Sequence, residues 1–168
     1  MANHVILRLD NVQATQDNSL MRSGLYKVSN TGADIDNGMP VEVGALVSGE
    51  RELRLLTAAT ATPTVLGITS TPEVNSEGDY DNDGHNLLTF YNKAGKAVRV
   101  HLLQAGDIFS VSALAFDGDA PTEGQAVGIA SGKWKAGAQN EIGKCIDIED
   151  VSGTTLYAIE ISTDKINQ

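Results

Sequence analysis

The sequence contains few cysteine, proline and aromatic residues. Its single cysteine, Cys145, excludes a disulfide within the chain and fits folding in a reducing compartment. The 4 prolines argue against an extended proline-rich chain, and 1 Trp, 4 Tyr and 3 Phe leave few aromatic platforms for a glycosidase. Stability must therefore come from packing of aliphatic residues.

Long apolar segments are also missing. No run approaches the roughly 20 residues that a membrane-spanning helix needs. The first residues, MANHVILRLDNVQ, lack the charged start and long apolar core of a signal peptide, and the chain has no Asn-x-Ser/Thr acceptor site. We therefore expect a protein that folds in a reducing cytosol, with no membrane partner.

Basic residues are in the minority. The 12 Lys and Arg against 22 Asp and Glu give a net charge of −10 and a pI near 4.6. Nucleic acids and anionic membranes favour basic surfaces, so neither is expected as the main partner. With 41% hydrophobic residues, the 168 residues suffice for one globular domain or two small similar halves.

Short apolar runs between Gly, Asn, Asp and Ser predict an all-β fold, either a small β-barrel or a β-sandwich. In 98–102 the apolar residues alternate with Arg99 and His101, as in a half-buried strand. The last predicted strand, at 156–161, is apolar on both faces until Glu160. This pattern indicates a strand with neighbours on both sides in its sheet. Gly49–Ala59 lacks a helix cap and is short, so a strand is favoured there. Further predicted strands are His4–Leu9, Gly24–Ser29, Val41–Val47, Val65–Thr69, Leu87–Tyr91, Phe109–Ala113, Ala126–Ala130 and Ile142–Ile148.

An internal similarity indicates two related modules. Leu25–Ser29 (LYKVS) resembles Ile108–Ser112 (IFSVS), and each is followed by an Asp/Gly-rich turn, a proline and another strand. We predict a β domain over 24–168. Its modules span about 24–72 and 106–161, joined by an acidic loop and a strand pair at 73–105.

Residues 1–23 differ from the rest. Asn11–Ser19 is polar and has no periodicity that would bury one face. The sequence predicts an extended N-terminal arm, which either becomes ordered on a partner subunit or stays loosely held.

The run GDYDNDGHNLLTF, residues 78–90, begins like a calcium loop. Asp79, Asp81, Asp83 and Gly84 match its first half, but Phe90 occupies the position of the bidentate glutamate. The flanking segments are not helices, and exposed turns select the same residues. A hydrophilic turn without metal is favoured over a calcium site at Asp79, Asp81 and Asp83.

Enzymatic motifs are absent from the sequence. His4, His85 and His101 show no zinc-binding spacing, and no Gly-x-Ser-x-Gly elbow is present. Gly128–Trp134 resembles a phosphate loop but has Trp134 where Ser or Thr would bind magnesium, so a turn between two strands is favoured. We predict no catalytic residue, no cofactor and no enzymatic activity.

Three segments resemble the decoration, or cement, proteins of tailed bacteriophages, which are small β-barrels. They are Gly38–Leu46 (GMPVEVGAL), Val65–Ile68 (VLGI) and Ala105–Phe109 (AGDIF). The similarity rests on the spacing of glycine and apolar residues over about 24–161.

This resemblance implies a structural virion protein that is made in the cytoplasm of a bacterial host and lies on the outer surface of an icosahedral capsid. It implies binding to the major capsid protein, stabilisation of the shell and a homo-oligomeric state. The arm would then provide the capsid-binding residues Val5, Leu7, Arg8, Leu9, Val12 and Arg22. The alternative is a β-sandwich module that binds a ligand or receptor and is stabilised by calcium.

Overall fold

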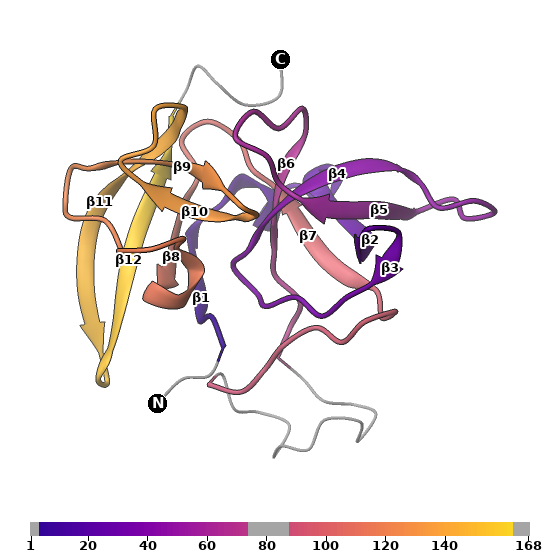
Figure 1. Ribbon diagram of the computed structural model, residues 1–168, viewed down its shortest axis with the longest axis horizontal. Helices are drawn as coiled ribbons and strands as arrows, with labels where there is room; N and C mark the ends of the chain where they lie inside the picture. Colours follow the sequence, from indigo (N-terminus) through magenta and orange to yellow (C-terminus); the bar gives the residue numbers. More distant parts are fainter. Residues whose placement is uncertain (1–3, 74–87, 163–168) are drawn as a thin grey trace.

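The computed structural model describes residues 4–73 and 88–162. Strands account for 50% and helices for 6%, which confirms the predicted all-β fold. Figure 1 shows two groups of strands side by side. The strands are β1 (Leu7–Asn11), β2 (Met21–Val28), β3 (Thr31–Gly32), β4 (Pro40–Leu46), β5 (Leu53–Ala58), β6 (Leu66–Thr69), β7 (Val98–Leu102), β8 (Ile108–Ser112), β9 (Ala126–Ala130), β10 (Lys133–Ala136), β11 (Glu141–Val151) and β12 (Thr154–Ile161); the described 3-10 helices are η1 (Gln13–Thr15), η2 (Asn18–Leu20) and η3 (Ala113–Ala115).

Five strands of the first group close into a barrel. Their order is β2-β5-β4-β6-β7, and β7 pairs back with β2. The pairing of β2 with β5 is parallel and the other four pairings are antiparallel. Val41, Leu56 and Val100 are fully buried inside. Closure lets these short strands satisfy their backbone groups without leaving exposed edges.

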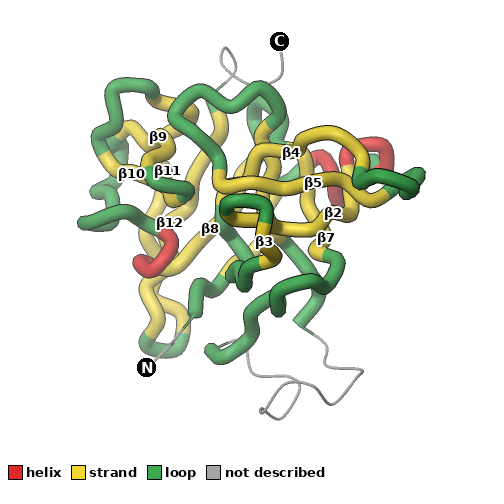
Figure 2. Tube along the Cα trace, turned by 45° about the vertical axis from the view of Figure 1, so that its right-hand side comes forward, coloured by secondary structure: helices red, strands yellow, loops and turns green. Residues whose placement is uncertain are grey.

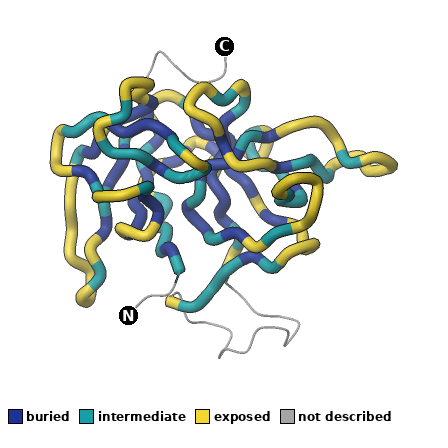
Figure 3. Tube along the Cα trace, viewed as in Figure 1, coloured by how far each residue is buried: buried dark blue, intermediate teal, exposed yellow. Residues whose placement is uncertain are grey.

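The second group is an antiparallel sheet in the order β1-β8-β12-β11-β9-β10. β12 lies inside this sheet, as its apolar faces predict. The turn between β9 and β10 has positive φ at Ser131 and Gly132, which confirms the turn predicted within Gly128–Trp134. The β11–β12 hairpin is long, and its far end is exposed (Figure 3).

The two groups share one hydrophobic core. Leu66 and Ile68 of the barrel belong to the same buried cluster as Phe109 and Trp134 of the sheet. The indole Nε1 of Trp134 donates a hydrogen bond to the backbone oxygen of Gly38 at 2.8 Å. Figure 2, which gives a turned view, shows the same division into two adjoining groups. The halves therefore form one folded unit.

Both halves pair their strands in the same order. In the barrel the antiparallel chain of pairings is β2–β7–β6–β4–β5, and in the sheet it is β8–β12–β11–β9–β10. The parallel β2–β5 pairing that closes the barrel corresponds to a single parallel bridge between Phe116 and Trp134. The second half is thus an incompletely closed version of the first, in agreement with the predicted duplication.

The pairings also give the correct alignment of the halves. Gly67 pairs with Leu102 and Val41, whereas Gly143 pairs with Ile161 and Val127 in the matching strands. Continuing this register makes Ile108 of the second half equivalent to Met21 of the first half. The sequence similarity had instead aligned Ile108 with Leu25. The apolar-polar alternation is the same at both offsets, so sequence alone could not choose between them.

The module boundary also changes. β7, predicted as part of the connection 73–105, completes the barrel and belongs to the first module. The predicted strand Leu87–Tyr91 is wrong over its described residues, which form a turn and irregular chain. Directly after it, Asn92 and Ile35 exchange two backbone hydrogen bonds in a single bridge, so this segment crosses the barrel end instead of extending a sheet.

The N-terminal segment is not a loosely held arm over its described residues. β1 pairs with β8, and Val12 and Ala14 are buried. The carboxylate of Asp107, which is 3% exposed, accepts hydrogen bonds from the backbone nitrogens of Gln13 (2.8 Å) and Gln104 (2.7 Å). Backbone hydrogen bonds and 3-10 turns order a polar stretch that has no periodic apolar face, which explains why its sequence looks unstructured.

Candidate functional site

The six predicted capsid-binding residues do not form one exposed surface. Val5 and Val12 are buried in the shared core, and Leu7 and Leu9 are partly buried against it. Arg22 donates hydrogen bonds to the backbone oxygens of Ser19 and Met21. The apolar members thus hold β1 on its own sheet, and their side chains are largely unavailable to another protein.

Arg8 is the member that faces solvent. Its guanidinium lies 2.7 Å from a carboxylate oxygen of Glu149 and 2.5 Å from one of Asp10. Hydrogen bonds to Glu149 and then to Asp10 raise the pKa of Arg8. These contacts join β1 to the β11–β12 hairpin across the surface of the sheet, where exposed ion pairs contribute little to stability.

β1 is nevertheless an edge strand. The backbone nitrogen of Ser112 donates a hydrogen bond to the backbone oxygen of Ile6. Ile6 and Ser112 are therefore a hydrogen-bonded pair of the antiparallel ladder between β1 and β8. Hydrogen-bonded and non-hydrogen-bonded pairs alternate. Leu7 and Leu9 therefore direct their backbone N–H and C=O groups away from β8, toward a side on which no described strand lies. Such an edge can accept another strand.

A second feature is an arginine-lined pocket of about 420 Å³ at the barrel. Its basic side chains come from β2, from the start of β5 and from β7, together with the segment before β5. Pairings of β2 with β5 and with β7 bring these positions together from distant parts of the chain. The residues lining the pocket are Asn18, Met21, Arg22, Ser23, Leu46, Arg51, Glu52, Arg54 and Arg99.

This concentration of positive charge contrasts with the rest of the protein. Four of the 12 basic residues line this pocket, although the net charge of the chain is −10. Sequence reasoning missed this pocket because its arginines come from three separate segments. The clustered basic residues of Arg51-Glu52-Leu53-Arg54 were the only local signal.

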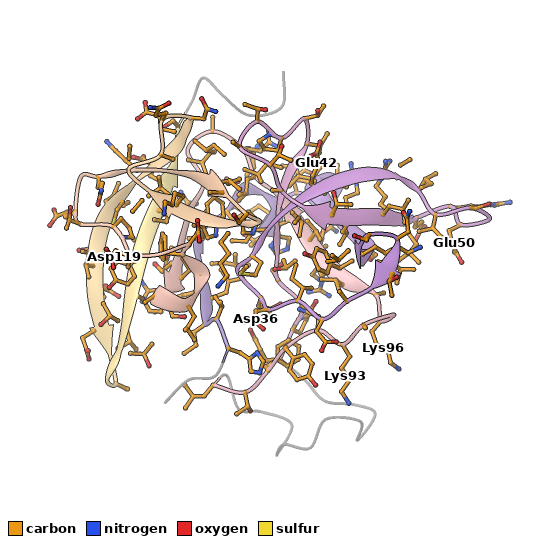
Figure 4. All side chains as sticks on the ribbon, viewed as in Figure 1. Asp36, Glu42, Glu50, Lys93, Lys96 and Asp119 are labelled. Carbon is orange, nitrogen blue, oxygen red and sulfur yellow. The ribbon has the colours of Figure 1, made fainter. Side chains whose placement is uncertain are left out.

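A third feature is a groove of about 470 Å³ between the barrel and the second sheet. Nδ1 of His4 lies 2.7 Å from a carboxylate oxygen of Asp36, and its ring stacks on Tyr91 at a centroid distance of 4.9 Å. Asp36 lies below the centre of the molecule in Figure 4, between the two halves. Its other oxygen accepts the backbone N–H of Val5 at 3.0 Å, so this carboxylate fastens the N-terminal segment to the barrel.

The predicted calcium loop, Asp79, Asp81 and Asp83, lies outside the described residues. Within residues 4–73 and 88–162, no group of three or more His, Cys, Asp or Glu is arranged to hold a metal ion. The described part of the chain also has no helix of the length and apolar character needed to span a membrane.

The barrel contains one buried histidine among the described residues, His101. This residue of β7 is 5% exposed, and its Nδ1 lies 3.1 Å from the hydroxyl oxygen of Ser70. Burial, and then the charge of Arg99, lower the pKa of His101 from its ordinary value of 6.5. The unfolded chain therefore binds a proton at a pH where the folded protein does not.

We expect the free energy of unfolding to decrease as the pH falls below about 6.5, the ordinary pKa of histidine. Urea titrations between pH 7.5 and 5 measure this slope. His101→Asn removes the titrating group and should flatten the slope, whereas His4→Gln, at the surface groove, serves as the matched control. An unchanged slope in His101→Asn would contradict the assignment.

The fold and its surface features define the class of the protein. It is a duplicated small β-barrel protein with an open strand edge and a basic pocket on an otherwise acidic chain. Residues 10–133 match the YonC prophage protein family. This match covers more than half of the chain, so the protein belongs to that family and is phage-derived. No curated protein and no solved structure matches the sequence.

Proposed function

We propose that this protein is a structural component of the phage particle that binds the major capsid protein on the outer surface of the capsid. It stabilises the shell through protein contacts and performs no catalysis. The single observation that supports this function best is the open edge of β1 on a rigid, duplicated β framework. Membership of a prophage protein family agrees with a role in the particle.

The proposed contact is strand addition. A strand or extended loop of the capsid protein lies along β1 and pairs with the outward backbone groups of Leu7 and Leu9. Main-chain hydrogen bonds give affinity in this mode, while nearby side chains such as Arg8 select the partner. Repetition over many equivalent sites on a shell converts modest contacts into stable attachment.

This contact revises the role of the N-terminal segment. The sequence left open whether an arm becomes ordered on a partner or stays loosely held, and the resemblance implied that its side chains are the capsid-binding groups. In the proposed function the segment is already folded, and its backbone edge is the binding group. Val5 and Val12 then act indirectly, because their burial fixes the position of β1.

The test is co-sedimentation with purified shells of the phage. Leu7→Pro removes an outward N–H, and an edge strand tolerates proline at such a position. Loss of a backbone hydrogen bond at a buried contact costs about 1 to 3 kcal/mol, so we expect shell affinity to fall about 5- to 150-fold.

Ala136→Pro is the matched control, because Ala136 faces outward on β10 at the opposite edge of the same sheet. Circular dichroism establishes that both variants are folded. Equal co-sedimentation of Leu7→Pro and Ala136→Pro, both folded, would exclude β1 as the contact. Failure of the wild-type protein to sediment with shells would overturn the proposed function itself.

A further inference from the structure

The arginine-lined pocket has four arginines and one carboxylate, Glu52, in its lining. No described carboxylate forms an ion pair with Arg22, Arg51, Arg54 or Arg99. Arg22 and Arg54 instead donate to backbone oxygens, and Arg51 and Arg99 are exposed. Like charges gathered in this way repel one another, and an anionic occupant would relieve that repulsion.

The pocket also has an apolar part. Leu46, which lies on its wall, is 44% exposed, and Met21 lines the same depression. A suitable occupant therefore combines carboxylates with exposed aliphatic side chains. Free phosphate would satisfy the arginines alone and leave Leu46 in water.

The β11–β12 hairpin has this combination of side chains. Asp147, Glu149 and Asp150 make its outer half acidic, and Glu149 is the one of these three that pairs with Arg8 of the same molecule. Ile148 and Val151, on the same stretch, are 39% and 43% exposed. The hairpin projects from the sheet as a narrow two-stranded ribbon, a shape that can enter an open depression (Figure 1).

One molecule cannot bring its own hairpin to its own pocket. The hairpin belongs to the group of strands on the left of Figure 1, whereas β5 and the segment before it lie at the right. Glu50, next to Arg51, is labelled at the far right of Figure 4. The two surfaces lie toward opposite ends of the long axis, so their pairing must be between molecules.

We propose that the β11–β12 hairpin of one copy docks into the arginine-lined pocket of a second copy, and that this head-to-tail contact builds a homo-oligomer. Such a contact uses two different surfaces, so it forms a ring when the rotation between copies closes. Neither contact surface includes residues of β1. This inference goes beyond the proposed shell binding and does not depend on it.

The experiment measures the mass of the full-length protein by sedimentation velocity at low and high salt. The variant Arg51→Glu/Arg54→Glu reverses the charge of the pocket, and Asp147→Lys/Asp150→Lys reverses the charge of the hairpin without breaking the Arg8–Glu149 ion pair. Each should raise the self-dissociation constant about tenfold or more, because like charges then face one another. The controls are Lys27→Glu/Lys133→Glu and Asp119→Lys/Glu123→Lys, which change the net charge equally at other surfaces and should leave the mass unchanged.

The quadruple variant that carries both reversals gives the sharpest result. Its charges are again complementary, so we expect the mass of the wild-type oligomer to return. A monomeric wild-type protein at low salt, or an oligomer that persists in both double variants, would overturn the proposal. Binding of inorganic phosphate by a wild-type protein that does not self-associate would identify the pocket as a simple anion site. That result would also overturn the proposal. Leu7→Pro should form the normal oligomer, which separates this test from that of shell binding.

Discussion

Trp134→Ala should lower the free energy of unfolding by about 3 to 5 kcal/mol, the range for removing a fully buried large aromatic side chain. Trp134 is fully buried, and its ring lies 5.1 Å from that of Phe109 between centroids. It also donates the 2.8 Å hydrogen bond to Gly38, in the barrel half. The substitution therefore removes both packing and a polar link between the two halves.

Trp134→Phe separates these contributions. It keeps an aromatic ring beside Phe109 but leaves the backbone oxygen of Gly38 without its donor. The unpaired backbone oxygen should lower the free energy of unfolding by about 1 to 3 kcal/mol. Because Trp134 is the single tryptophan, urea unfolding must be followed by circular dichroism rather than by fluorescence. A loss below about 1 kcal/mol for Trp134→Ala would contradict a shared core.

Gly143→Ala should also be strongly destabilising. A Cβ at Gly143 would lie 2.3 Å from the backbone oxygen of Glu160, on the paired strand β12. A backbone atom in a ladder cannot move aside, so the strands must separate locally. The expected cost is about 1 to 3 kcal/mol or more, as for overpacking of a buried site.

The matching position of the barrel gives a second result. A Cβ at Gly67 would lie 2.3 Å from Cγ1 of Val100, on the matching strand β7, so Gly67→Ala should also destabilise. Gly44→Ala is the control, because its nearest atom would be 3.3 Å away and the expected change is below about 1 kcal/mol. Thermal melts compare the three variants. Similar stability of Gly143→Ala and Gly44→Ala would contradict the close approach.

Much of the fold could be predicted from local patterns. Alternation identified β7 and β8, two apolar faces placed β12 inside its sheet, and the missing cap correctly favoured a strand at β5. These features depend on residues close in sequence, for which side-chain periodicity is a direct signal. The duplication was also visible, because each half repeats the same strand-turn-proline order.

Other features depend on contacts that local patterns do not encode. The N-terminal segment is fixed by Asp107, about a hundred residues away, and the arginine-lined pocket requires the β2–β5 and β2–β7 pairings. Bulges in β4 and β11 shift the register of their pairings, which local apolar patterns do not reveal. The sequence similarity aligned β2 and β8 incorrectly because the apolar-polar alternation is the same at both offsets.

The most direct measurement of the central proposal is an electron cryo-microscopy map of phage shells saturated with the protein. We predict density for the duplicated barrel on the outer surface, with a strand of the major capsid protein paired along the open edge of β1. Undecorated shells, or a bound protein whose β1 edge faces solvent, would contradict it.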